Sequence, residues 1–162
     1  DGIVRLRIEG DEASVRYRAG RLAERLAPLG EVLAEHDPEV SRAIWSRLRD
    51  VAALADAPVV WRVSLRPTQA PALIAQVTAA VGAPRVQLDW GGGLVWLAVG
   101  VEAEAAIRGA LAGGHATLVK APMEARARIA VFQPQSAAVA GLAAGLKQKF
   151  DPRGILNPGR MG

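Results

Sequence analysis

The stretch that decides the fold is PRVQLDWGGGLVWLAVG, residues 84–100. Two runs rich in Val, Leu and Trp, which are side chains that favour β-strands, flank three consecutive glycines. Glycine permits the left-handed backbone conformations that tight hairpin turns require. The stretch therefore predicts two antiparallel strands joined at Gly91, Gly92 and Gly93.

Strands and helices alternate on both sides of this hairpin. Upstream, residues 58–67 alternate in hydrophobicity and predict a strand, one face of which carries Val59, Trp61, Val63 and Leu65. Residues 67–82 then predict a helix that Thr68 caps and Gly82 ends. Downstream, residues 101–114 predict a short helix and residues 115–122 a strand. Two β-α-β units around a hairpin predict an α+β, ferredoxin-like antiparallel sheet with helices packed on one face.

The ends of the chain carry further predicted elements. Near the N-terminus we expect a half-buried strand over 3–10, a helix over 11–26, a short strand over 31–35 and a helix that Ser41 caps. Residues 121–135 resemble a bridge, of which 129–132 could pair with something outside the domain, and 134–150 predict a last helix. We therefore expect a ferredoxin-like domain over 1–120, and a bridge, C-terminal helix and docking tail over 121–162.

Composition narrows the possible functions. The 162 residues are 51% apolar and 22% charged, which suits one globular domain. The net charge is +4, but the arginines are scattered among acidic residues, so we expect no nucleic-acid partner. The absence of cysteine excludes disulfides and thiolate chemistry, and two distant histidines predict no metal site. No apolar run approaches the roughly 20 residues of a transmembrane helix.

The hairpin offers the first candidate site. Asp89, Trp90 and Trp96 flank the glycine run, and a Trp beside bare glycines presents a flat apolar surface that suits an aromatic ligand. A mobile hairpin with no function is the alternative.

Two other features are weaker candidates. Arg62 and Arg66 share one face of their strand and become anion-binding candidates if that face is covered; otherwise they meet solvent or a carboxylate. His115 follows Gly113 and Gly114 and is either structural or part of the site. No phosphate-binding glycine loop, catalytic triad or carboxylate pair is present, so we predict no catalytic residue. The residues leave open a cap domain over a cofactor held elsewhere and a stand-alone interaction module.

The tail, KQKFDPRGILNPGRM at 147–161, is unusually constrained for a chain end. Pro152 and Pro158 restrict the residues before them, and Ile155 and Leu156 form a short apolar plug. A segment this constrained has little entropy to lose when it docks, which predicts packing against another surface.

This tail resembles the C-terminal signature of FAD-linked oxidases of the vanillyl-alcohol-oxidase/PCMH type, in which a helix precedes Asp-Pro, an apolar pair and Asn-Pro-Gly. More narrowly, QLDWGGGLVWLAVG (87–100) and GGHATLVKAP (113–122) resemble the FAD-binding subunits of bacterial glycolate oxidases. WSRLRD (45–50) and WRVSL (61–65) extend the resemblance.

The resemblance implies a ferredoxin-like cap domain from a longer protein whose N-terminal FAD-binding domain is absent from this sequence. FAD would be bound mainly by that domain, onto which the tail residues Asn157, Pro158 and Gly159 would dock. Facing the flavin and substrate would be Asp89, Trp90, Gly91, Gly92, Gly93, Arg62 and His115.

In such a family the reaction is the oxidation of a 2-hydroxy acid, glycolate, to glyoxylate within a multisubunit complex. The implied partners are a catalytic flavoprotein sister subunit and an iron–sulfur subunit. The implied location is the cytoplasm, or the periphery of the inner membrane through the complex. This chain alone is expected to be inactive. The alternative is a ferredoxin-like interaction module without catalysis.

One departure from related enzymes limits what the resemblance implies. Catalytic 2-hydroxy-acid dehydrogenases carry a hairpin resembling HxGDGNxH and a Glu-His-Gly after a Gly-Gly, where this chain reads LDWGGGLVW (88–96) and GGHATLV (113–119). The metal ligands and the catalytic histidine of those relatives therefore have no counterpart here.

Overall fold

The computed structural model describes residues 2–156. The chain forms two compact units, one running up to Arg47 and the other from Leu48 onward, here called the N-terminal unit and the sheet unit. The predicted docking residues Asn157, Pro158 and Gly159 lie outside the described residues. Their role, and the predicted division of the chain at residue 120, stay predictions.

The N-terminal unit is helical. Helix α1 spans Glu12–Leu26 and begins at Asp11, whose Oδ1 accepts a hydrogen bond of 3.0 Å from the backbone N of Ser14. A 3-10 turn, η1 (Ala27–Leu29), follows it. Helix α2 spans Pro38–Arg49, so it begins before the predicted cap. The residue that caps it is Asp37, whose Oδ1 accepts hydrogen bonds from the N–H groups of Glu39 and Val40. The prediction that Ser41 caps this helix is wrong.

The two strands predicted at this end of the chain are also wrong. Residues 3–9 are extended but form no β-ladder, and residues 31–35 form none either. Ile3 and Val4 are 80% and 85% exposed. Alternation can mark one face of a strand, but a strand also needs a neighbour for its N–H and C=O groups, and these segments have none among the described residues.

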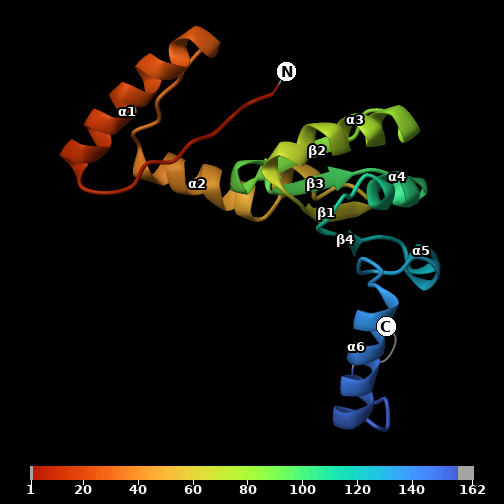
Figure 1. Ribbon diagram of the computed structural model, residues 1–162. Helices are drawn as coiled ribbons and strands as arrows, with labels where there is room; N and C mark the ends of the chain where they lie inside the picture. Colours follow the sequence, from red (N-terminus) through yellow and green to blue (C-terminus); the bar gives the residue numbers. More distant parts are fainter. Residues whose placement is uncertain (1, 157–162) are drawn as a thin grey trace. The chain divides into compact units, whose positions relative to one another are not determined.

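The sheet unit contains four strands, β1 (Val60–Ser64), β2 (Arg85–Asp89), β3 (Leu94–Ala98) and β4 (His115–Lys120). Their order is β2-β3-β1-β4, and every neighbouring pair is antiparallel. Helix α3 (Ala70–Val81) connects β1 to β2, and helix α4 (Glu104–Gly109) connects β3 to β4 (Figure 1). This arrangement confirms the predicted α+β, ferredoxin-like fold.

Short 3-10 turns lead into both helices, namely η3 (Pro67–Gln69) and η5 (Val101–Ala103). Thr68 lies inside η3, and no side-chain hydrogen bond caps α3, so the prediction of a Thr68 cap is wrong. Gly82 ends α3 as predicted, with a φ of 88° that an L-residue rarely adopts.

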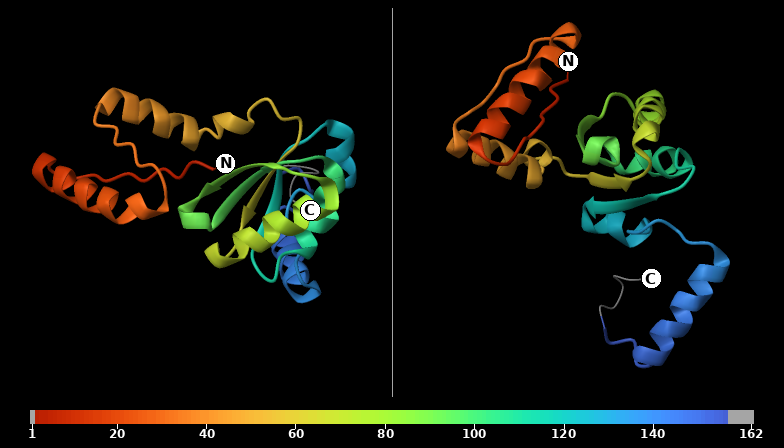
Figure 2. Two further views of the ribbon diagram at one scale, coloured as in Figure 1. Left: turned by 90° about the horizontal axis from the view of Figure 1, so that it is seen from above. Right: turned by 60° about the vertical axis from the view of Figure 1, so that its left-hand side comes forward.

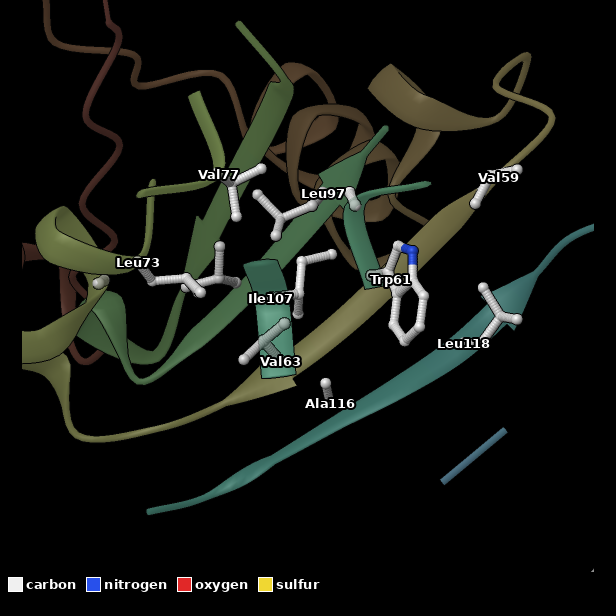
Figure 3. Packing of buried hydrophobic residues seen from close by; sticks show 12 residues of the cluster. Val59, Trp61, Val63, Leu73, Val77, Leu97, Ile107, Ala116 and Leu118 are labelled. Carbon is white, nitrogen blue, oxygen red and sulfur yellow. The ribbon is translucent and has the colours of Figure 1, made fainter. Parts of the chain in front are cut away.

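The main core lies between the helices and one face of the sheet, and both helices cover the same face (Figure 2). Val59, just before β1, and Trp61 and Val63 within it point into this core, as the alternation predicts, and are at most 5% exposed. Figure 3 shows them packed with residues of the neighbouring strands and of both helices, among them Leu73, Val77, Leu97, Ile107, Ala116 and Leu118. Burial of these apolar side chains is the main stabilising contribution to the fold.

The segment after β4, which the sequence predicts to be a connecting bridge over 121–135, contains regular structure and contacts with the rest of the sheet unit. It contains helix α5 (Met123–Arg128), and beyond it the carbonyl oxygen of Val131 accepts a 2.8 Å hydrogen bond from the backbone N of Leu118. Arg108 of α4 ties the same segment down, because its Nη1 donates to Gln133 Oε1 at 3.1 Å. The expectation that residues 129–132 pair outside the domain is therefore wrong at Val131, which pairs with β4.

Helix α6 spans Ala137–Phe150, as predicted. All of its residues are exposed, and it contributes to neither core cluster. Its larger apolar side chains, between 49% and 77% exposed, are Val139, Leu142, Leu146 and Phe150.

The other face of the sheet is only partly covered. Residues around the 3-10 turn η2 (Ala52–Leu54) pack against one end of it, in a second cluster made of Leu54, Ala57 and Val60 with Val51, Trp96 and Ala98. A bidentate ion pair holds this segment to β2: the Nη1 and Nη2 of Arg85 lie 3.0 and 3.2 Å from the two carboxylate oxygens of Asp56. The whole of this face, opposite the two helices, is here called the open face.

This ion pair gives a test of the fold in solution. The hydrogen bond from Arg85 lowers the pKa of the Asp56 carboxyl below its ordinary value. A carboxyl with a lowered pKa in the folded state contributes stability above its unfolded pKa, and loses it as the pH falls through the folded pKa. We expect Arg85→Gln to raise the pKa of Asp56 toward its ordinary value in a carboxyl-carbon NMR titration. Asp50, whose pKa Arg49 lowers, is the internal control and should not move. An Asp56 titration that is the same with and without Arg85 would contradict this pairing.

Candidate functional site

The turn between β2 and β3 has an unusual backbone. It forms the 3-10 turn η4 (Trp90–Gly92), in which three successive residues have positive φ: Trp90 at 53°, Gly91 at 62° and Gly92 at 98°. Glycine accepts this region freely, whereas it costs a bulky L-residue roughly 1–2 kcal/mol. Asp89 offsets part of that cost, because its Oδ1 accepts a 2.7 Å hydrogen bond from the backbone N of Trp90. The turn thus holds Trp90 in a strained conformation.

This conformation places Trp90 near Arg62. Trp90 remains 63% exposed, and the centroid of its indole ring lies 5.7 Å from the Cζ of Arg62. The centroid of Trp96 lies 5.8 Å from the same atom. Both distances fall within the range of a cation–π interaction, worth about 0.5–2 kcal/mol depending on desolvation. Two indole rings therefore flank one guanidinium on the open face.

Strand register explains why these residues meet. Trp96 of β3 is paired directly with Arg62 of β1 on one side and with Gln87 of β2 on the other. On the far side of β1, Arg62 is paired with Thr117 of β4. Residues directly opposite each other on antiparallel strands project from the same face. Gln87, Trp96, Arg62 and Thr117 thus form a row across the open face, here called the Arg62 row.

Some polar groups of this row have no partner among the described residues. Gln87 is engaged, since its Nε2 donates a 2.8 Å hydrogen bond to the carbonyl oxygen of Leu48. Within residues 2–156, by contrast, Arg62 makes no hydrogen bond or ion pair, although its side chain is half-buried. The hydroxyls of Thr117 and of Ser64, both half-buried, also have no hydrogen-bond partner in this part of the chain.

His115 lies beside the row. It begins β4, is exposed and is paired with Ser64 of β1. Together they border an open depression of about 330 Å³, which is lined by Ser64, Leu65, Arg66, Gly113, Gly114 and His115. The loop approaches β1 closely at Gly114, where a Cβ atom would lie 2.2 Å from the carbonyl oxygen of Ser64.

The structure therefore brings most of the predicted site residues to one face. Arg62 and Trp90 are in contact, Asp89 and the three glycines build the turn that positions Trp90, and His115 borders the neighbouring depression. Their roles toward a flavin or a substrate stay predictions. Sequence reasoning missed Thr117, although the alternation of HATLVK places residues 115 and 117 on the same face as Arg62.

No group of three or more His, Cys, Asp or Glu side chains lies close enough together to hold a metal ion within residues 2–156. No helix in that range has both the length and the apolarity to cross a membrane.

Comparison with curated proteins identifies a relative of this chain. No family model matches the chain, and no solved structure matches it significantly. Among curated proteins, the glycolate oxidase subunit GlcE of Escherichia coli (strain K12) is 35% identical over 165 residues. The match covers 99% of this chain and 39% of the relative, so the chain spans about two fifths of the relative's length. Over nearly its whole length this chain is therefore similar to part of the glycolate oxidase subunit GlcE, which confirms the resemblance indicated by its hairpin and tail.

Proposed function

We propose that this chain is the cap domain of an FAD-dependent subunit that oxidises glycolate, or a close 2-hydroxy acid, to the corresponding 2-oxo acid within a multisubunit complex. The observation that carries the proposal is the similarity to GlcE over 99% of the chain. The partly covered sheet face carries an exposed Trp and an Arg that has no hydrogen bond or ion pair within residues 2–156, and both support a covering role over a cofactor and substrate.

The residues on this face fit the ring end of a flavin better than its phosphate end. Trp90 offers an exposed aromatic surface beside glycines, and Arg62 offers a positive charge. The chain has no glycine-rich phosphate loop, so the pyrophosphate of FAD would be held by the N-terminal FAD-binding domain that we propose as its partner. When bound, the flavin would supply the acceptor for the hydride on the substrate α-carbon.

Within this proposal the residues of the chain bind and orient. Trp90 would cover the reacting groups and exclude water, and Arg62 would bring positive charge to an anionic substrate. Asp89 and the three glycines would keep the Trp90 ring in position. His115 would border the same region from β4.

The remaining parts of the proposal concern partners. Asn157, Pro158 and Gly159 would dock onto the FAD-binding domain, and electrons would pass from the flavin to an iron–sulfur subunit, with a catalytic flavoprotein sister subunit beside it. The complex would be cytoplasmic or peripheral at the inner membrane. The alternative, a ferredoxin-like interaction module, predicts that Trp90 and the tail can be changed without affecting any flavin.

The Trp90→Ala variant of the full-length protein, assembled with its partner subunits, tests the cap proposal. We expect a shifted flavin absorbance spectrum and a loss of about tenfold in glycolate-dependent dye reduction, since one aromatic contact is worth about 0.5–1.5 kcal/mol. Tyr17→Ala, which removes an aromatic side chain that is 70% exposed on α1, is the matched control and should change neither. A Trp90→Ala complex with the wild-type spectrum and rate would remove the hairpin from the site.

A further inference from the structure

The open face contains a positive charge that nothing in the described chain neutralises. Arg62 is half-buried, yet it makes neither a hydrogen bond nor an ion pair within residues 2–156. Guanidinium groups removed from water ordinarily have an anionic or hydrogen-bonding partner, because an unpaired charge is costly to desolvate. The two flanking indole rings lower that cost, but they take none of its N–H donors.

Two carboxylates associated with this face already accept hydrogen bonds. Asp89, on the β2 edge of the same face, accepts the hydrogen bond that holds the Trp90 turn. Asp56 is paired through both of its oxygens with Arg85. The donors of Arg62 thus remain available for an anion that is not part of the described chain.

Two hydroxyls extend the donor set. Thr117 is paired directly with Arg62 across β1 and β4, and Ser64 lies two residues from Arg62 on the same face of β1. Both side chains are half-buried and without a hydrogen-bond partner among the described residues. A planar guanidinium beside a hydroxyl matches a carboxylate, which accepts two parallel N–H bonds and has lone pairs left for an O–H donor.

Arg66 is a poorer candidate for the same role. It is exposed, it borders the open depression near His115, and neither indole ring lies over its guanidinium. A cation in that position is well solvated and discriminates weakly between anions.

We infer that Arg62, together with the hydroxyl of Thr117, is the receptor for the carboxylate of a small 2-hydroxy monocarboxylic acid, with Trp90 and Trp96 as its walls. The inference rests on the proposed function for the identity of the acid, while the carboxylate specificity rests on the unpaired donors themselves. It assigns Arg62 to substrate binding and leaves the redox chemistry to the flavin. The ligand bound by this chain is the carboxylate end of the acid.

The test uses the full-length protein in its assembled complex and two probes, glycolate as substrate and oxalate as a dicarboxylate that is not oxidised. In Arg62→Gln we expect the KM for glycolate and the inhibition constant of oxalate to rise about 10- to 100-fold, the loss typical of a charge-assisted bidentate pair, with a smaller change in kcat. Arg62→Lys should raise both constants less than Arg62→Gln, because Lys keeps the positive charge but cannot form the two parallel N–H bonds of a guanidinium. Thr117→Val should raise both constants about 3- to 10-fold, as for one neutral hydrogen bond.

Arg126→Gln is the matched control, since it removes an exposed arginine of α5 and should leave both constants unchanged. Unchanged glycolate KM and oxalate inhibition in Arg62→Gln would overturn the inference. If Arg62→Gln does not fold, as judged by circular dichroism, Arg62→Lys and Thr117→Val test the inference instead. A wild-type KM for glycolate and a wild-type inhibition constant for oxalate in both variants would overturn it.

Failure of the proposed function would look different. A wild-type complex that does not oxidise glycolate would refute the proposed reaction, while the receptor is still tested by oxalate binding measured as quenching of tryptophan fluorescence. Quenching in the wild type that is lost in Arg62→Gln would support the receptor, and the same quenching in both, or none in either, would overturn it.

Discussion

Leu97→Ala is expected to lower the free energy of unfolding of the sheet unit by about 3 kcal/mol, within the 2–5 kcal/mol typical of buried Leu-to-Ala changes. Leu97 is fully buried on β3, where it is paired with Trp61 on one side and Val86 on the other. The substitution removes apolar surface from the centre of the core and leaves a cavity that a four-stranded sheet can close only in part. Urea denaturation followed by tryptophan fluorescence measures the loss.

Leu88→Ala provides the matched control within the same sheet. Leu88 lies on the edge strand β2 and is 51% exposed, so the same chemical change should cost less than about 1 kcal/mol. Equal losses at the two positions would contradict the burial of Leu97 at the centre of the core described here.

The second large effect is expected at Gly114. A Cβ atom there would lie 2.2 Å from the carbonyl oxygen of Ser64, and the φ of +97° is itself unfavourable for any L-residue. Because the obstacle is backbone, Gly114→Ala must displace either the loop or the end of β1. We expect a loss of about 2–4 kcal/mol in the free energy of unfolding, from a steric clash added to about 1–2 kcal/mol of backbone strain.

The control for this prediction is Gly109→Ala. Gly109 ends α4 with nothing within 4 Å of a new Cβ, so Ala should leave stability unchanged or raise it by up to about 1 kcal/mol, its advantage over Gly in a helix. A Gly114→Ala protein as stable as the wild type would mean that the loop before β4 does not approach β1 as described.

Much of the fold could be predicted from the sequence because its strongest patterns coincide with its buried elements. The alternation of Val59, Trp61 and Val63 identifies the core face of β1, and the glycine run identifies the hairpin. The same rule fails at residues 3–9, since hydrophobic alternation does not supply a neighbouring strand. The cap of α2 was misassigned although Asp37 followed by Pro38 is itself a helix-start signal.

The candidate site could be predicted only in part, for a geometric reason. Alternation indicates that Arg62 lies on the face opposite the core. Its position between Trp90 and Trp96 depends on the register of β1 against β3 and on the left-handed conformation of Trp90, neither of which a residue pattern specifies. Thr117 went unrecognised because a Thr in a strand is ordinarily unremarkable, and only the pairing with Arg62 singles it out.

The central claim, that this chain belongs to a flavin-dependent subunit which oxidises glycolate, is tested most directly by adding glycolate to the purified full-length protein in its assembled complex under anaerobic conditions. The account predicts that the complex contains FAD and that glycolate bleaches its visible absorbance, with one glyoxylate formed for every two electrons that the flavin and the other acceptors of the complex take up. A complex that contains no flavin, or whose flavin spectrum glycolate leaves unchanged, would contradict it.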